Sequence, residues 1–252
     1  MSRIFITGSA DGLGQMAATL LISQGHDVVL HARSSQRAEQ ALNKVTGAKN
    51  VLIGDLSSMD ETKALAGQVN ALGKFDAVIH NAGVYRVPGE IIVAVNTLAP
   101  YILTCLIQRP KRLIYLSSGM HSYGRLNLES LANDTNRISY SDSKLHVVTL
   151  SMAVARKWPE VCSNSVDPGW VATKMGGHGA PDNLEKGFET QAWLAASEDE
   201  GSKVSGRYFF HKKISKHNNQ ADDITSQENF LSVCEQITGV KFPGGHSIDK
   251  WT

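Results

Sequence analysis

A tyrosine and a lysine four residues apart, Tyr140 and Lys144, form the pair in this sequence best suited to acid–base chemistry. On a helix, residues at positions i and i+4 share one face, with their β-carbons roughly 5–6 Å apart. A free tyrosine has a pKa of about 10, which is too high for efficient proton exchange near pH 7. We expect the Lys144 ammonium to lower the pKa of the Tyr140 phenol and so make it a usable proton donor. Taken alone, the pair could also be a coincidence on a protein surface.

A glycine-rich loop at residues 7–14 lies close to the amino terminus and suits a dinucleotide. It follows a short apolar run at residues 3–7 and precedes a helical pattern at residues 15–24. The glycines allow a sharp turn and close backbone approach, and the N–H groups at the start of the helix can bind a pyrophosphate. The alternative is a glycine turn without a ligand. The expected contacts come from Gly8, Ala10, Asp11, Gly12, Leu13 and Gly14.

Strand and helix patterns alternate along the chain, and the elements that they predict must position these residues. Beyond the first unit, strands are expected at residues 27–32, 50–54, 77–80, 112–117, 162–166 and 207–210. Helices are expected at residues 35–44, 58–72, 95–106, 140–158 and 186–196. The alternation predicts an α/β fold with a doubly wound, mostly parallel sheet of the Rossmann type, which binds its ligands beyond the carboxyl ends of the strands. The candidate residues all fall at those ends.

The length and composition are consistent with a single domain of 252 residues, 42% of them hydrophobic. We expect residues 1–211 to form the dinucleotide-binding and catalytic domain. Residues 212–252 then form a linker, a helix and a tail packed on that same domain. Residues 212–223 are polar enough for a flexible linker. An amphipathic helix is predicted at residues 227–238, where it caps the core.

The charge, apolar stretches and histidine spacing of the chain argue against nucleic acid, membranes and metal ions as partners. A net charge of +1 provides no broad field for nucleic acid or an anionic membrane. Cys105, Cys162 and Cys234 are widely spaced, which favours reduced thiols and a cytoplasmic location. The first strand begins too early to leave room for a signal peptide, and apolar stretches are interrupted before membrane-spanning length. The nine histidines show no paired spacing, so no metal site is expected.

Four motifs, which occur in order, make the chain resemble the short-chain dehydrogenase/reductase family over almost its whole length. They are the glycine loop, then Asn81, Ala82 and Gly83, then Ser117 and Ser118 with Tyr140 and Lys144, and finally residues 167–173. The resemblance implies a catalytic group of Asn96, Ser118, Tyr140 and Lys144. It also implies cofactor contacts from Asn81, Ala82, Gly83, Tyr140, Lys144, Pro168, Gly169, Val171 and Thr173.

Each member of the implied group has a chemical role. Tyr140 would donate a proton to the oxygen of a carbonyl that receives a hydride, and Ser118 would orient that oxygen. Lys144 would also hold the ribose hydroxyls of the nicotinamide nucleoside, and Asn96 would position a water molecule leading to Lys144. The alternatives are a helix cap for Ser118 and a helix hydrogen bond for Asn96. Ser118 is preferred over Ser117 because neighbours in an extended segment point to opposite faces.

The end of the second strand indicates the cofactor. Enzymes that use NAD place an acid there to bind the adenosine ribose, whereas this chain has Ala32 followed by Arg33 and Ser34. A guanidinium at this position suits the 2′-phosphate of NADP. Asp11 in the glycine loop argues against NADP. Arg33 could instead be a solvated charge that binds no ligand. Asp55 and Leu56 would lie near the adenine, although Asp55 could equally be an ordinary turn residue.

The substrate is expected to be a small carbonyl or alcohol compound, apolar or aromatic in character. The loops that should shape its pocket carry Met120, His121, Tyr123, Trp170, Met175 and His178. The pattern of residues 166–177 resembles bacterial ketoreductase-like and retinol-dehydrogenase-like members of the family. A nucleotide sensor without catalytic activity is the first alternative, but it would not need serine, tyrosine and lysine together. A sugar-nucleotide epimerase or dehydratase, the second, normally has a larger carboxyl-terminal domain.

Two features leave the oligomeric state open, a homo-oligomer included. Fifteen positions separate Asn81 from Asn96, so the connection on the surface that many relatives use to dimerise is short. The chain also continues for about forty residues beyond the last expected strand. That tail could cover either the same surface or the site.

Overall fold

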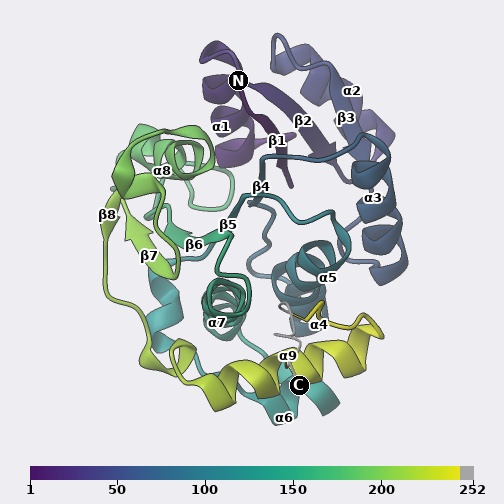
Figure 1. Cartoon of the computed structure of the whole chain (residues 1–252), viewed down its shortest axis with the longest axis vertical. Coiled ribbons are helices and arrows are strands. Elements are labelled where there is room, and N and C mark those ends of the chain that lie inside the picture. The colour runs from purple at the N-terminus through teal and green to yellow at the C-terminus, as the bar shows by residue number, and fades with distance from the viewer. Residues whose placement is uncertain (245–252) are drawn as a thin grey trace, which may run out of the picture.

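An eight-stranded sheet in the order β3-β2-β1-β4-β5-β6-β7-β8 forms the centre of the molecule (Figure 1). The computed structural model describes residues 1–244; the last part of the predicted tail, residues 245–252, lies outside them. The first seven strands are parallel and β8 is antiparallel to β7. The strands are β1 (Arg3–Ile6), β2 (Asp27–Ala32), β3 (Asn50–Ile53), β4 (Ala77–His80), β5 (Arg112–Leu116), β6 (Cys162–Asp167), β7 (Arg207–Phe210) and β8 (Lys213–Ile214). The predicted doubly wound α/β fold and single domain are confirmed.

Helices cover both faces of this sheet (Figure 1). α1, α2 and α8 pack on one face, and α3, α5 and α7 on the other. The helices are α1 (Gly12–Ser23), α2 (Ser35–Lys44), α3 (Met59–Ala71), α4 (Gly89–Ile92), α5 (Ala99–Leu106), α6 (Leu128–Asn133), α7 (Tyr140–Lys157), α8 (Leu184–Ala196) and α9 (Ile224–Thr238). Alternate residues of each strand serve the two layers: Ile4 and Ile6 join the core under α1 and α8, whereas Phe5 joins the opposite core.

The helix that carries Asn96 differs from the expected one at residues 95–106. It begins at Gly89, and residues Val93–Leu98 form a π-helix between α4 and α5. The whole segment Gly89–Leu106 has a mean hydropathy of 1.5 and is 78% buried inside the protein. Its length and composition would allow it to cross a membrane, and its burial shows that it serves here as a core helix. A π-turn shifts the following side chains around the axis and is common at functional sites.

Residues 212–244 pack against the domain, and the segment 212–223, expected to be a flexible linker, contains two short elements. Residues 213–214 form β8, and a short 3₁₀ turn follows at Asn219–Ala221. α9 packs against α7 and α6 (Figure 1). Beyond it, the Val240 carbonyl accepts a hydrogen bond of 2.8 Å from the Tyr101 hydroxyl in α5. Val240 and Phe242, which follow α9, therefore join the main core beside residues of α5 and α7.

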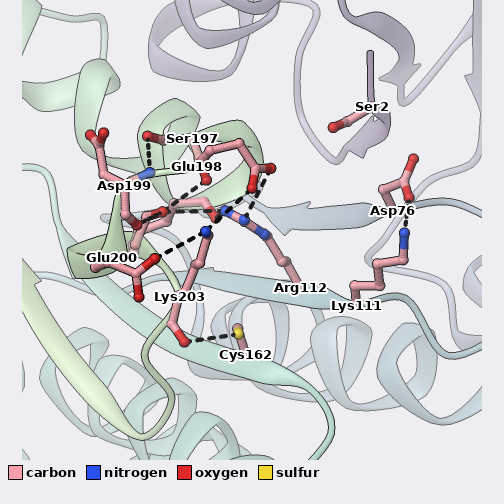
Figure 2. Close-up of polar contacts among 12 residues, drawn as sticks. Ser2, Asp76, Lys111, Arg112, Cys162, Ser197, Glu198, Asp199, Glu200 and Lys203 are labelled. Carbon is pink, nitrogen blue, oxygen red and sulfur yellow. Dashed lines mark hydrogen bonds and ion pairs between the residues drawn. The ribbon is translucent and has the colours of Figure 1, made fainter.

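Exposed ion pairs occupy the end of the sheet opposite the carboxyl ends of the strands. Figure 2 shows Arg112 beside Glu198, Lys203 bound to Glu200, and Lys111 bound to Asp76 at 3.0 Å. Such pairs contribute only about 0–1 kcal/mol each when solvated. This end of the sheet is thus charged and well separated from the glycine loop and the tyrosine.

Candidate active site

The glycine loop is packed directly against the segment that follows β4. Gly8 has φ +64°, and a β-carbon there would lie 2.9 Å from the Cα of Ala82. The Asn81 amide donates to the carbonyls of Thr7 at 2.9 Å and Gly8 at 3.2 Å. Asn81 and Ala82, predicted as cofactor contacts, therefore pack against the glycine loop. Gly12, with φ +55°, faces open space on the other side, because a β-carbon there would have no atom within 4 Å.

Gly14→Ala is expected to lower the free energy of unfolding by about 1–3 kcal/mol. Its β-carbon would lie 2.3 Å from Nδ2 of Asn81 and 2.8 Å from the Gly8 carbonyl oxygen. Urea unfolding measures the effect. Gly67→Ala in α3 is the matched control, because nothing lies within 4 Å of its β-carbon position. Equal stability of the two variants would show that the loop is not closely packed here.

Asp11 caps α1 and is paired with two cations. Its carboxylate accepts from the Gly12 N–H at 2.9 Å, forms an ion pair with Arg37 at 3.2 Å, and contacts the Lys174 ammonium. The Lys174 hydrogen bond is the main cause that lowers the pKa of Asp11 to about 2. Sequence reasoning missed Arg37 and Lys174, since neither lies in a motif. The positive charges of Arg37 and Lys174 offset the negative charge of Asp11, which had argued against binding of the 2′-phosphate of NADP.

The predicted adenosine end of the site has one free guanidinium. Arg33 is exposed and makes no ion pair with any residue in the range 1–244, while the Ser34 hydroxyl caps α2. The Asp55 carboxylate accepts from the N–H and the hydroxyl of Ser57, which is the ordinary turn named above as the alternative. Leu56 is buried at 6% exposure.

Buried His31 braces this end of the site, a role that the sequence did not reveal. Its Nδ1 accepts from the Gly8 N–H at 2.9 Å, and its Nε2 lies 2.8 Å from the Gly54 carbonyl. Burial lowers the pKa of His31, so the ring is neutral and donates from Nε2. The imidazole thereby ties the glycine loop to the end of β3.

Tyr140 and Ser118 meet at the carboxyl end of β5, whereas Ser117 points elsewhere. The Ser117 hydroxyl donates to the Lys144 carbonyl at 2.9 Å. The Ser118 hydroxyl acts to lower the pKa of the Tyr140 phenol, and it also caps the short 3₁₀ turn Gly119–Tyr123 through the Met120 N–H. The cap named above as the alternative for Ser118 is therefore present, and its catalytic role stays a prediction.

The expected lowering of the tyrosine pKa is not found in the chain by itself. Burial raises the pKa of Tyr140 to about 12, although the contact with Ser118 acts in the opposite direction. Loss of water around the phenol disfavours the phenolate, and this outweighs the opposing contact with Ser118. At neutral pH the tyrosine therefore holds its proton.

Lys144 is buried under Tyr140 at the foot of the site. Its ammonium donates to the Leu116 carbonyl at 2.8 Å and lies 5.5 Å from the centre of the Tyr140 ring. Burial lowers the pKa of Lys144 to about 8. A β-carbon on Gly83 would come within 3.3 Å of Nζ, so this glycine leaves room for the ammonium.

Asn96 links the segment after β4 to α7. Its Oδ1 accepts from the Val84 N–H at 2.8 Å, and its Nδ2 donates to the Val84 carbonyl at 3.0 Å and to the Ser143 hydroxyl at 3.1 Å. Both polar atoms of the Asn96 amide are therefore hydrogen-bonded to protein groups, and these bonds connect the segment after β4 with α7. These partners lie in a loop and on α7, which differs from the helix hydrogen bond named above as the alternative, and the role of Asn96 toward a water molecule stays a prediction.

The sequence is similar to those of known dehydrogenases and oxidoreductases. A sequence model of the short chain dehydrogenase family matches residues 2–103. An uncharacterized oxidoreductase of Emericella nidulans is 47% identical over 97% of this chain and all of its own length. Short-chain dehydrogenase chyC of Penicillium rubens is 43% identical over 96% of this chain and all of its own length. The chain belongs to the short-chain dehydrogenase/reductase family.

Solved structures share its fold. An uncharacterized protein from Mycobacterium paratuberculosis superposes with a TM-score of 0.82 at 23% identity, covering 96% of this chain and 95% of its own. A blue fluorescent protein from a metagenomic library, solved with NADPH, has a TM-score of 0.67 at 19% identity, covering 83% and 95%. Within residues 1–244 of this short-chain dehydrogenase/reductase, His, Cys, Asp and Glu form no cluster suited to a metal ion.

The loop after β6 of this short-chain dehydrogenase/reductase is braced by its own contacts. Gly169 has φ +80°, and the Trp170 N–H donates to Asp182 at 2.6 Å. The Thr173 hydroxyl accepts from Gly176, and Val171 is buried. Five of the predicted pocket residues have exposed side chains, namely Met120, Tyr123, Trp170, Met175 and His178. His121, the remaining predicted pocket residue, is buried at 1% exposure.

Proposed function

We propose that this protein is an oxidoreductase that transfers a hydride between NADP(H) and a carbonyl or secondary alcohol. The observation that carries the proposal is the meeting of the Tyr140 phenol, the Ser118 hydroxyl and the Lys144 ammonium at the carboxyl end of β5. A nucleotide sensor has no need of this group, and the family is one of dehydrogenases. The description short-chain dehydrogenase of a 43% identical relative points the same way.

Tyr140 would transfer the proton, whereas Ser118 would orient the substrate oxygen. Tyr140, protonated at neutral pH, donates its proton to the carbonyl oxygen as negative charge develops there. Ser118 orients the same oxygen by a hydrogen bond, and Lys144 stabilises the phenolate that remains. The nicotinamide, when bound, supplies or accepts the hydride. In the oxidative direction Tyr140 accepts the proton of the alcohol.

The site fits a dinucleotide, and its charges favour NADP. Open space beside Gly12 leaves the loop backbone accessible at the start of α1, where N–H groups can bind phosphate. Lys144 can reach ribose hydroxyls from the foot of the site. Arg33 is exposed and without an ion pair in the described part of the chain, so it is available for a 2′-phosphate. A structural neighbour was solved with NADPH.

The proposed substrate is an apolar or aromatic carbonyl compound, because Met120, Trp170 and Met175 are large side chains exposed on the two loops around the site. We further propose a cytoplasmic location, where a reducing environment suits the free thiols of Cys105, Cys162 and Cys234. Neither nucleic acid nor membrane is proposed as a partner.

Arg33→Ala is expected to weaken NADPH binding by about 1.5–3 kcal/mol, or roughly 10-fold to 150-fold, and to leave NADH binding nearly unchanged. The physical reason is the loss of a charge-assisted contact with the 2′-phosphate. Fluorescence titration of the wild type and the variant with both dinucleotides measures the ratio. Lys44→Ala, at the other end of α2, is the matched control. Equal losses for the two dinucleotides, or a wild type that prefers NADH, would contradict the NADP assignment.

A further inference from the structure

The 3₁₀ turn that begins after Ser118 is bound by the carboxyl-terminal segment, residues 212–244. The part of that segment between β8 and α9 (Figure 1) supplies the contacts. The Asn218 side-chain amide donates to the Gly124 carbonyl at 3.1 Å, at the end of the turn. The Asn218 backbone N–H donates to Nε2 of His121, inside the turn, at 3.3 Å. One residue of the carboxyl-terminal segment therefore contacts the turn at two points.

His121 connects Asn218 to the backbone of Ser118. Its Nδ1 lies 2.7 Å from the Ser118 carbonyl oxygen, which can only accept a hydrogen bond, so Nδ1 carries the proton. Burial lowers the pKa of His121, so the ring is neutral and its Nε2 can accept from the Asn218 N–H. The His121 backbone N–H also donates to the Ser118 carbonyl, at 3.0 Å. His121 thus donates two hydrogen bonds to one backbone oxygen of Ser118.

These contacts leave the His121 imidazole no direct part in proton transfer to a substrate. The residue is 1% exposed, and both of its ring nitrogens are hydrogen-bonded within the protein. The ring also packs against Tyr208 of β7, with ring centres 4.5 Å apart. The imidazole therefore connects segments of the protein and does not contact a ligand.

The same turn also packs against α7, the helix that carries Tyr140. A β-carbon on Gly124 would overlap the Ser141 carbonyl oxygen, so the end of the turn fits closely against the start of that helix. The Ser118 hydroxyl itself is held only by the Met120 N–H at 3.3 Å, which is long for such a bond. The position of the hydroxyl therefore depends mainly on how firmly the backbone of the turn is held.

We propose that His121 is a positioning residue that holds Ser118 in place for catalysis, and that the carboxyl-terminal segment acts on Ser118 through it. The inference rests on the proposed function, in which Ser118 orients the substrate oxygen. A displacement of a catalytic group by about 1 Å can reduce turnover by about 10²-fold. Loss of the imidazole is expected to lower the turnover number and to leave NADPH affinity nearly unchanged, because the turn supplies none of the predicted cofactor contacts.

A double-substitution cycle with Ser118 tests the inference. His121→Phe keeps a ring beside Tyr208 and removes both side-chain hydrogen bonds. We expect its turnover number in carbonyl reduction to fall roughly 10-fold to 30-fold. In the Ser118→Ala background the same substitution should lower the residual turnover by less than about twofold, because His121 acts through the serine hydroxyl. A merely structural role would reduce turnover equally in both backgrounds.

His121→Asn is the conservative variant. Its side-chain amide can donate to the Ser118 carbonyl from a position similar to that of Nδ1. We expect this variant to retain at least about a third of the wild-type turnover number. A loss as large as that of His121→Phe would show that the hydrogen bond to the Ser118 carbonyl is not what matters.

Amide hydrogen exchange without cofactor tests the contact independently of activity. Asn218→Ala removes the donor to the Gly124 carbonyl. We expect the amides of His121 and Gly124, which close the turn through the carbonyls of Ser118 and His121, to exchange at least about fivefold faster in this variant. Asn219→Ala, which replaces an exposed neighbour, is the matched control and should leave both rates unchanged.

The outcomes are distinct. Unchanged turnover in His121→Phe, equal losses in the two backgrounds, or equal exchange rates in Asn218→Ala and Asn219→Ala would overturn the inference. If His121→Phe does not fold, the exchange rates and turnover of Asn218→Ala decide, and wild-type values of either would overturn it. A wild type that reduces no carbonyl compound would contradict the proposed function, whereas the exchange rates would still show whether the carboxyl-terminal segment holds the turn.

Discussion

Tyr140→Phe should reduce the turnover number roughly 10²-fold to 10⁴-fold while NADPH affinity changes by less than about threefold. The substitution removes only the phenolic hydroxyl. The ring that packs 4.7 Å from the Tyr85 ring and lies over Lys144 is retained. The proton that neutralises the developing alkoxide then has no donor in the site. Steady-state kinetics of carbonyl reduction and fluorescence titration with NADPH measure the two quantities.

Tyr123→Phe is the matched control for this result. It deletes the same hydroxyl from a side chain that is 86% exposed and lies on the loop after Ser118. Tyr123 is a predicted pocket residue without a part in proton transfer, so turnover in the control should fall by less than about threefold. Normal turnover in Tyr140→Phe would exclude Tyr140 as the proton donor, and comparable losses in both variants would indicate damage to the loop.

Lys144→Met is expected to reduce turnover at least about 100-fold and to weaken NADPH binding roughly tenfold. Methionine fills most of the space of the lysine stem, so the core around it is kept. The variant loses the cation that stabilises the tyrosine phenolate and the donor assigned to the ribose hydroxyls. Parallel measurements of turnover and NADPH affinity separate the two effects.

Lys157→Met on the same helix provides the comparison, since its ammonium pairs with Glu228 at the surface at 2.8 Å. We expect little change in either quantity for that variant. If NADPH affinity is unchanged in Lys144→Met, the ribose role is wrong. If turnover is also unchanged, the lysine has no part in the chemistry.

The strands and most helices could be predicted from the sequence because each carries a local signal. β2 and β4 begin and end at the predicted residues, 27–32 and 77–80. Glycine turns, apolar runs and the serine cap at Ser139 all act within a few residues of the element that they define. The meeting of Tyr140 with Ser118 was predictable for a different reason, since parallel strands bring their carboxyl ends to one edge.

The features that were missed depend on contacts between distant segments. Lys174 reaches Asp11 across 163 positions of the chain, and no periodicity indicates such a pair. β8 has only two residues and is held by its pairing with β7. The direction of the tyrosine pKa was wrong for a related reason: spacing places Lys144 near Tyr140, but burial is set by the whole fold and raises the pKa to about 12.

The most direct test of the account is a steady-state assay of NADPH oxidation by the wild-type protein against a panel of apolar and aromatic aldehydes and ketones, with Tyr140→Phe measured beside it. We expect at least one carbonyl compound to drive NADPH consumption and to appear as its alcohol. We also expect NADH to be a poorer donor and Tyr140→Phe to consume almost no NADPH. Folded protein that binds NADPH but reduces none of the panel, or a Tyr140→Phe variant as active as the wild type, would contradict the account.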